Sequence, residues 1–501
     1  MNKIVFFNKT VRGHLHKLRD IPCEDYSDSF SDPDGRYYIA VIADGHGDKA
    51  CFRSSTGSKA VVEATVAQLK DLAWAILRED PEETSLPLTE QMKYPKGIQM
   101  IMRGLTDRII AKWYQTIRND LSDNPPTDEE YHSAGDREAS YRAGEHLEHI
   151  YGTTVIAALW VADYLILLHQ GDGRCDVFYD DGTVDQPIPW DVRCHENVTT
   201  SMCDADADVS FRHCVIDMSK KKVVACFLGS DGVEDSFPDP DGNQSGTHYF
   251  YRKLAVTVKD MDKADIEAYL EDYLPGFSED GSGDDVSVAA LVDTDAICPL
   301  LPEYSKTVFK YEIDSRVRTV DEKLISMQRK HGILQRRALE AQTEAADSEK
   351  AAQSCRDQID RLSKELAELE EQKTAAFSAM QAQSEESGKA REYLEQQESS
   401  EGFMTLIKFL GNGFNTGLHS LIEDACHTKA KEYESVSERA SAKAAELETA
   451  EAELGRLAAA EEAAQEHLRQ AQAEFETYDA EYQRLSTEKQ KLLSCTNEDP
   501  S

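Results

Sequence analysis

The stretch YYIAVIADGHGDKA, residues 37–50, indicates how the first half of the chain folds. Its opening run, residues 37–43, carries no charge and leads directly into an Asp-Gly-His-Gly turn. An apolar run that is rich in aromatic and β-branched residues and ends at Asp-Gly is typical of a buried strand followed by a turn. The end of this strand brings together a carboxylate (Asp44), a glycine backbone (Gly45) and an imidazole (His46).

Further acidic residues border apolar runs in the same half of the chain. They are Asp172 in GDGR, Asp231 in SDGVED, Asp284 just before VSVAALV, and the pair Glu24-Asp25 near the start. One Asp-Gly pair indicates only a turn, but carboxylates gathered at one edge of a sheet repel one another unless cations neutralise them. Hard divalent ions prefer such all-oxygen sites. We therefore expect a centre for Mn²⁺ or Mg²⁺.

The second half of the chain has a different composition. No proline occurs between Pro302 and Pro500, and strong helix formers dominate. Mostly uncharged residues recur at alternating steps of three and four, which predicts the seam of a coiled coil. The seam residues are Cys355, Ile359, Leu362, Leu366, Leu369, Lys373, Ala376 and Met380, and then Tyr433, Val436, Ala440, Lys443, Leu447, Ala450, Leu454, Leu457, Glu461, Ala464, Leu468, Ala471, Phe475, Tyr478, Tyr482, Leu485, Lys489 and Leu492.

The segment between the two seams, EGFMTLIKFLGNGFNTGLHSLIEDA, contains four glycines and no heptad pattern. We interpret it as the tip at which the chain doubles back, which predicts a long antiparallel helical coiled-coil hairpin. Its apolar residues have two interpretations: they pack within the tip, or they form an apolar face for a partner or a membrane surface. Parallel dimerisation through each helix is a further alternative.

Composition narrows the class of protein. The chain has 501 residues and a formal net charge of −39, so it is long enough for two or three domains and too acidic for sequence-independent binding of nucleic acid. Its 11 cysteines include no CxxC pair, which favours free thiols in a reducing compartment. Neither a signal peptide nor a membrane-spanning apolar stretch is evident. We expect a cytoplasmic protein that has no nucleic-acid partner, and the sequence disfavours a membrane partner.

The ordered motifs CED, DGHG, GTT, GDGR, SDGVED and GDDVSV resemble those of the metal-dependent protein phosphatases, the protein phosphatase 2C-like Ser/Thr phosphatases, and especially the bacterial members. The resemblance covers about residues 5–295. It implies an α+β fold, a β-sandwich of two mostly antiparallel sheets flanked by helices (αββα). It also implies hydrolysis of phosphoserine and phosphothreonine, with phosphoproteins as substrates and a cognate Ser/Thr kinase as a partner.

The same resemblance implies which residues hold the metals. Asp44 would bridge two Mn²⁺ or Mg²⁺ ions, and the carbonyl of Gly45 would be a ligand of one of them. Asp231 and Asp284 would complete the first metal site. Glu24 would hold the second ion, directly or through water.

Three further roles are implied in the same way. Asp25 would orient the ligands around it, and Asp172 resembles the residue that helps to bind a third, weaker metal. His46 resembles the general acid beside the leaving oxygen, and an imidazole suits this proton transfer near neutral pH.

The sequence departs from the family pattern where an arginine usually contacts the phosphate. That position, four residues before the acidic pair, is Asp20, and Arg19 stands beside it. Either an extra residue in this segment brings Arg19 to the phosphate, or His16 makes the contact. A second departure is Asp48, which follows DGHG where many members have another glycine.

We therefore expect a phosphatase with a helical extension. The predicted parts are residues 1–300 as the phosphatase domain with a helical and polar insertion at 82–150, 301–314 as a linker, 315–400 and 428–495 as the coiled-coil helices, and 401–427 as the apolar tip. The hairpin would localise the enzyme, form a homodimer, or act only as a spacer. Two rival functions are a catalytically weak module that binds phosphoproteins or scaffolds a complex, and a membrane-curvature or filament protein.

Overall fold

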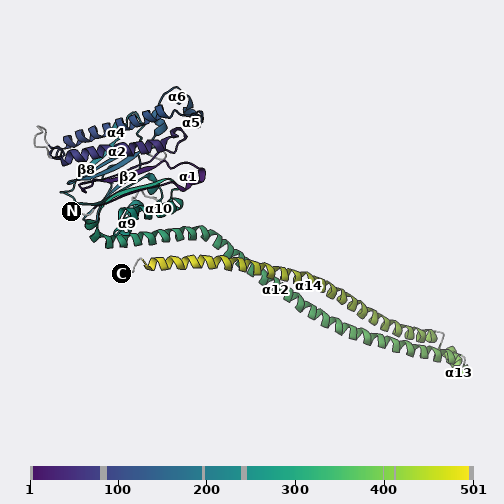
Figure 1. Cartoon of the computed structure of the whole chain (residues 1–501). Helices are drawn as coiled ribbons and strands as arrows, with labels where there is room; N and C mark the ends of the chain where they lie inside the picture. Colours follow the sequence, from purple (N-terminus) through teal and green to yellow (C-terminus); the bar gives the residue numbers. More distant parts are fainter. Residues whose placement is uncertain are drawn as a thin grey trace. The chain divides into compact units, whose positions relative to one another are not determined.

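The computed structural model describes residues 4–78, 87–194, 198–237, 245–398, 400–410 and 413–495. The chain forms two compact units (Figure 1). The first extends to Asp314, and the second begins at Ser315.

The first unit contains two antiparallel sheets of five strands each, in the orders β1-β10-β9-β6-β7 and β2-β3-β4-β5-β8. The strands are β1 (Ile4–Val11), β2 (Tyr26–Ser31), β3 (Tyr37–Ala43), β4 (Val155–Val161), β5 (Tyr164–Gln170), β6 (Arg174–Tyr179), β7 (Val184–Asp185), β8 (Arg212–Asp217), β9 (Val223–Gly229) and β10 (Val286–Asp293). Apolar residues of both sheets, such as Ile42, Leu167 and Leu228, are buried in one shared cluster. The sheets therefore pack face to face, as the family resemblance implied.

Helices cover the outer face of each sheet. Helices α2 (Ser54–Leu77) and α4 (Pro95–Asp123) lie side by side and share a buried core with β3, β4 and β5 (Figure 1). Helices α9 (Ser245–Val258) and α10 (Lys263–Asp280) share another buried core with β1, β9 and β10. The result is the expected αββα order of layers, because each sheet must bury both of its faces.

The remaining helical elements of the first unit are short. They are α1 (His14–Arg19), α3 (Leu88–Gln91), α5 (Asp128–Ser133), α6 (Glu138–Arg142), α7 (Ala207–Ser210), α8 (Asp231–Glu234) and α11 (Thr294–Ile297), with the 3-10 helices η1 (Lys49–Cys51), η2 (Gly135–Arg137), η3 (Leu147–Tyr151) and η4 (Cys298–Leu300).

The expected insertion at 82–150 contains α4, so part of it belongs to the helical layer; its first residues, 82–86, lie outside the described residues. Arg53 connects this segment to the start of α2. Its guanidinium donates to both carboxylate oxygens of Glu130, at 2.8 and 3.1 Å, and to Asp120 at 3.0 Å. It also donates to the carbonyl of Asn124 at 2.7 Å. Only 12% of the Arg53 side chain is exposed, so these bonds link α2, α4 and α5 in a largely dry environment.

The second unit consists of the long helices α12 (Leu301–Glu398, from Ser315) and α14 (Gly413–Cys495), with α13 (Glu401–Leu410) near the tip (Figure 1). Ion pairs join Asp321 to Lys489 at 2.6 Å and Arg391 to Glu423 at 2.9 Å. As residue numbers rise along α12, those of the partners in α14 fall, so the helices are antiparallel. All predicted seam residues are buried or half-buried, which confirms the coiled-coil hairpin.

Residues 301–314, which we expected to be a linker, are the first turns of α12 and pack in the first unit. Tyr304 is buried in the same cluster as Phe227, and Tyr311 stacks on Tyr249 with ring centroids 4.2 Å apart. The expected tip, 401–427, is mostly helical and exposes Phe409. None of the described helices is both long and apolar enough to cross a membrane.

Candidate functional site

Three of the predicted acidic corners meet at one edge of the sandwich. Asp44 follows β3, Asp172 follows β5, and Asp231 begins α8 directly after β9. One carboxylate oxygen from each of these residues lies within 4.8 Å of the other two. The structure therefore brings together side chains that are far apart in the sequence but stand at equivalent strand ends.

Burial and mutual repulsion make this group costly to ionise. Burial raises the pKa of Asp231 to about 7, and the charges of Asp172 and Asp284 add to the effect. Burial also raises the pKa of Asp44 well above its ordinary value, and the charges of Asp231 and Asp25 raise it further. Buried like charges are unfavourable unless a cation compensates them.

The acidic pair Glu24-Asp25 lies beside this group. The hydroxyl of Ser54 donates to Oε1 of Glu24 at 2.7 Å. Three buried carboxylate oxygens, Oε2 of Glu24, Oδ2 of Asp25 and Oδ1 of Asp172, have no hydrogen-bond partner among the described residues. Buried polar atoms are normally paired, so these unpaired carboxylate oxygens are suited to bind a cation. This donor set fits Mn²⁺ or Mg²⁺, which prefer oxygen ligands.

Asp284 is held by His16 rather than by the three-carboxylate group. Nε2 of His16 lies 3.3 Å from Oδ1 of Asp284, and Nδ1 of His16 lies 2.9 Å from Oδ1 of Asp285. These three residues form a second group of close potential ligands. The charge of Asp284 contributes to the raised pKa of Asp231, so the two groups are electrostatically linked.

Asp285, to which the sequence analysis assigned no role, organises this edge of the site. Its Oδ1 accepts the backbone N–H of Gly13 and its Oδ2 accepts that of Glu24, each at 2.6 Å. Burial opposes ionisation of Asp285, but the bonds from His16 and the two backbone groups outweigh it, so its pKa is lowered. The pair Asp284-Asp285 is visible in the sequence, but these long-range partners are not.

The structure separates the two residues considered for phosphate contact. Arg19 is exposed at the end of α1, whereas His16 reaches the acidic edge. Arg12, which the sequence analysis did not consider, also lies at this edge, and its guanidinium donates to the carbonyl of His16 at 3.1 Å. Its Nε is buried and has no hydrogen-bond partner among the residues described.

The corner that carries His46 is fixed by the GTT motif. Thr154 donates its backbone N–H to the carbonyl of Asp44 at 2.8 Å, and the hydroxyl of Thr153 donates to the same oxygen at 2.8 Å. The N–H of His46 donates to the carbonyl of Gly152 at 3.1 Å. A Cβ on Gly152 would lie 2.6 Å from Cδ2 of His46, so the ring requires glycine at this position. Burial lowers the pKa of His46 to about 4.

Gly45 is required for a different reason. A Cβ at this position would collide with the backbone carbonyl of Glu24. The absence of a side chain at position 45 therefore lets the turn after β3 approach the pair Glu24-Asp25. Any larger residue at this position would push that pair away.

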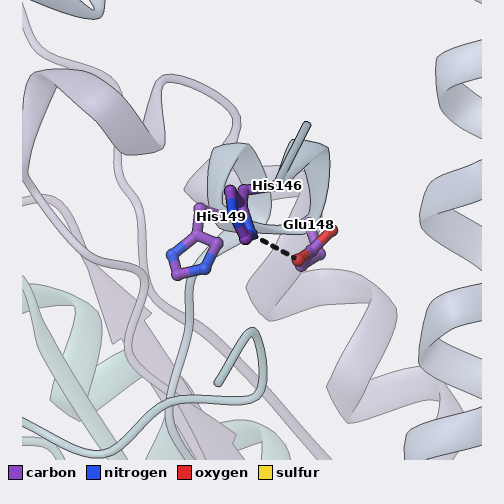
Figure 2. Close-up of side chains that lie close together, drawn as sticks. All are labelled: His146, Glu148 and His149. Carbon is purple, nitrogen blue, oxygen red and sulfur yellow. Dashed lines mark ion pairs between the residues drawn. The ribbon is translucent and has the colours of Figure 1, made fainter. Parts of the chain in front are cut away.

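A further group of potential ligands lies in the turn before β4. His146, Glu148 and His149 each place one ligand atom within 4.8 Å of the other two (Figure 2). This turn reaches His46 through the backbone, because Gly152 donates its N–H to the carbonyl of His149 at 3.1 Å. The sequence analysis missed this group, although the residues stand together as HLEH.

Comparison with known proteins identifies the family. The family model of protein phosphatase 2C matches residues 12–274, which is more than half of the chain. The chain therefore belongs to the protein phosphatase 2C family. No curated relative matches the chain.

Several solved structures share a distant similarity with the chain. A bacterial serine phosphatase is 19% identical, with 58% of this chain and 98% of that chain covered and a TM-score of 0.33. The serine/threonine phosphatase Stp1 from Staphylococcus aureus is 17% identical, with 58% and 95% covered and a TM-score of 0.33. The catalytic domain of the phosphatase PstP, in complex with two manganese ions, is 16% identical, with 58% and 99% covered and a TM-score of 0.33. The family assignment rests on the family model.

Proposed function

We propose that this protein hydrolyses phosphoserine and phosphothreonine in proteins, with two Mn²⁺ or Mg²⁺ ions in the carboxylate site. The observation that carries the proposal is the convergence of Asp44, Asp172 and Asp231 within 4.8 Å in a chain of this family. Buried, unpaired carboxylate oxygens beside them support it.

We assign the metal-holding residues as follows. Asp44 would contribute to both ion sites. Asp231, Asp284 and the carbonyl of Gly45 would hold the first ion, and Glu24 would hold the second, directly or through water. When bound, the ions supply positive charge to the phosphoryl oxygens and a nucleophile derived from water at neutral pH.

Two more carboxylates of the chain support this set. Asp172 contributes to a third, weaker site, and its unpaired Oδ1 suits this role. Asp25 orients the neighbouring ligands, since it is buried next to Glu24.

His46 and His16 have different tasks in the proposal. His46 donates a proton from its imidazole to the leaving oxygen of the serine or threonine, and the glycine at position 152 leaves room for its ring. A phosphate dianion beside the ring favours its protonated form. Both ring nitrogens of His16 contact carboxylates, so His16 is a positioning residue for Asp284. Arg19, with its exposed side chain, remains our candidate for contact with the phosphate.

The test measures hydrolysis of p-nitrophenyl phosphate and of a phosphothreonine peptide with Mn²⁺, with EDTA, and in the variant Asp231→Asn. The matched control is Asp280→Asn, because Asp280 is exposed at the end of α10. Activity that requires the metal, is lost in Asp231→Asn and persists in Asp280→Asn would support the proposal. A well-folded, Mn²⁺-loaded protein that hydrolyses neither substrate would favour the alternative, a phosphoprotein-binding module.

We propose that the hairpin localises the enzyme or joins two copies of it. The seams of α12 and α14 already bury each other within one chain, so a dimer would use other faces of the helices. Light scattering of the full chain, compared with a chain that ends at Asp314, distinguishes a dimer that forms through the hairpin from a monomer. We also propose a cognate Ser/Thr kinase as a partner, as the family resemblance implies.

A further inference from the structure

The turn that carries His146, Glu148 and His149 gathers three ligand groups in a short segment. In a 3-10 helix, side chains three residues apart lie on the same side. His146 immediately precedes η3 (Leu147–Tyr151), so its ring and that of His149 are neighbours, with centroids 5.7 Å apart. Nδ1 of His146 lies 3.7 Å from Oε1 of Glu148 (Figure 2).

We propose that His146, Glu148 and His149 bind a zinc ion, or a similar transition metal, at a site distinct from the carboxylate centre. Two imidazole nitrogens and one carboxylate oxygen are a typical zinc set that leaves a position for water. Bonds of about 2.1 Å in tetrahedral geometry require ligand atoms about 3.4 Å apart. The ligand atoms lie within 4.8 Å of one another, so they must move closer together to bind the ion, and the exposed side chain of His146 has room to move.

The site is partly preorganised. The Sγ atom of Cys203 lies 3.7 Å from Nδ1 of His149, and Cys203 is buried. This contact restrains the ring and leaves Nε2 of His149 for a metal, in the way that partners of the second nitrogen orient histidine ligands in metal sites.

The two sites differ in the metals they should select. The carboxylate centre offers only oxygen ligands, which suit Mn²⁺ and Mg²⁺. The η3 site offers two nitrogens, which favour zinc. The formal net charge of −39 raises the local concentration of any divalent cation near the protein.

The η3 site is bonded to the corner that carries His46. The carbonyl of His149 accepts the N–H of Gly152, and the carbonyl of Gly152 accepts the N–H of His46, each at 3.1 Å. A metal on η3 therefore restrains the segment that holds the His46 backbone. We expect zinc to alter turnover, a consequence that rests on the proposed phosphatase function.

Zinc binding is measured by isothermal titration of the full chain in excess Mg²⁺, which occupies the carboxylate centre. The variants are His146→Gln, whose side chain is exposed, and His149→Gln. The control is His132→Gln, because His132 pairs with Glu138 at 3.2 Å but belongs to no three-ligand group among the described residues.

The expected result is one zinc ion that binds the wild-type protein and His132→Gln equally. It should bind His146→Gln and His149→Gln at least about 10-fold more weakly, because loss of a ligand costs no less than loss of the outer partner of a ligand. If His149→Gln fails to fold, His146→Gln decides alone. Equal affinity and stoichiometry in the wild type and His146→Gln would overturn the proposal. Because the titration needs no hydrolysis, a phosphatase without activity leaves this test intact.

Discussion

The backbone N–H of Glu24 donates a 2.6 Å hydrogen bond to the carboxylate of Asp285, 261 residues further along the chain. The other oxygen of Asp285 accepts the N–H of Gly13. One buried carboxylate therefore fixes the start of the acidic pair and the entrance to α1 together. The position of Glu24 beside Asp44 depends on a residue that is not itself a proposed metal ligand.

Replacement of Asp285 by alanine should destabilise the first unit. Two buried backbone N–H groups would lose a charged acceptor, which should lower the free energy of unfolding by about 3 kcal/mol. Urea denaturation measures the change, with Asp280→Ala as the control at an exposed position. Equal midpoints for the two variants would show that Asp285 does not support this edge.

Arg53→Gln should loosen the helical layer on the second sheet. The largely buried guanidinium holds Glu130 and Asp120 with bonds of 2.8 to 3.1 Å, and its loss leaves both carboxylates without their cation. We expect a loss of about 3 kcal/mol in the free energy of unfolding. Thermal and urea denaturation at neutral pH measure it, and Arg108→Gln, which removes a single exposed bond to Gln68, is the control.

The free energy of unfolding should also fall at acidic pH, because protonation of Glu130 removes its ion pair with Arg53. The bond from Arg53 lowers the pKa of Glu130 to about 2, from 4.5 in the unfolded chain. The stabilisation is therefore complete above the unfolded pKa and is lost as the pH falls from about 4.5 towards 2. The difference in unfolding free energy between the wild type and Arg53→Gln should narrow from neutral pH to about pH 3. A constant difference would contradict this origin of the effect.

His46→Ala should affect substrates unequally if His46 protonates the leaving group. The serine alkoxide of a phosphopeptide needs a proton, whereas p-nitrophenolate is a stable anion. We expect kcat to fall by about 10²- to 10⁴-fold for the phosphopeptide and much less for p-nitrophenyl phosphate. Steady-state kinetics with Mn²⁺ test this, and an equal fall for both substrates would assign His46 to another role.

The alanines that are buried in the helical hairpin should tolerate no larger residue. Ala352 is fully buried, while its neighbour Ala351 is exposed. Ala352→Leu would force α12 and α14 apart and lower the melting temperature of the helical signal in circular dichroism, because overpacking costs about 1–3 kcal/mol. Ala351→Leu, the same substitution on the other face, should leave the melting temperature unchanged.

Sequence patterns predicted the parts of the fold that repeat along the chain. The seam from Tyr433 to Leu492 follows a heptad, and a heptad predicts that its seam residues face a partner helix. The strand before Asp44 was equally clear from its apolar run. The expected linker at 301–314 shows where such sequence patterns fail. Pro302 suggested a break between the two parts of the chain. Proline is tolerated in the first turn of a helix, however, and α12 begins at Leu301.

The candidate site was predictable only where its residues stand at strand ends. Asp44, Asp172 and Asp231 were found because each follows an apolar run and a sheet aligns such ends. The role of Asp285 could not be found, because its partners lie 261 and 272 residues away. The His146 group needed the 3-10 geometry of η3, which no pattern in HLEH indicates.

The hairpin also determines the order in which its own contacts can form. The pair Arg391–Glu423 is separated by 32 residues, Arg356–Glu461 by 105, and His331–Asp479 by 148. Each doubling of the loop to be closed costs about 0.6 kcal/mol in chain entropy. Helix pairing should therefore nucleate near α13 and propagate away from it. Each new contact between α12 and α14 then closes only a short loop beyond the contacts that have already formed. Despite contacts between residues so distant in sequence, the hairpin should fold with the kinetics of a locally connected protein.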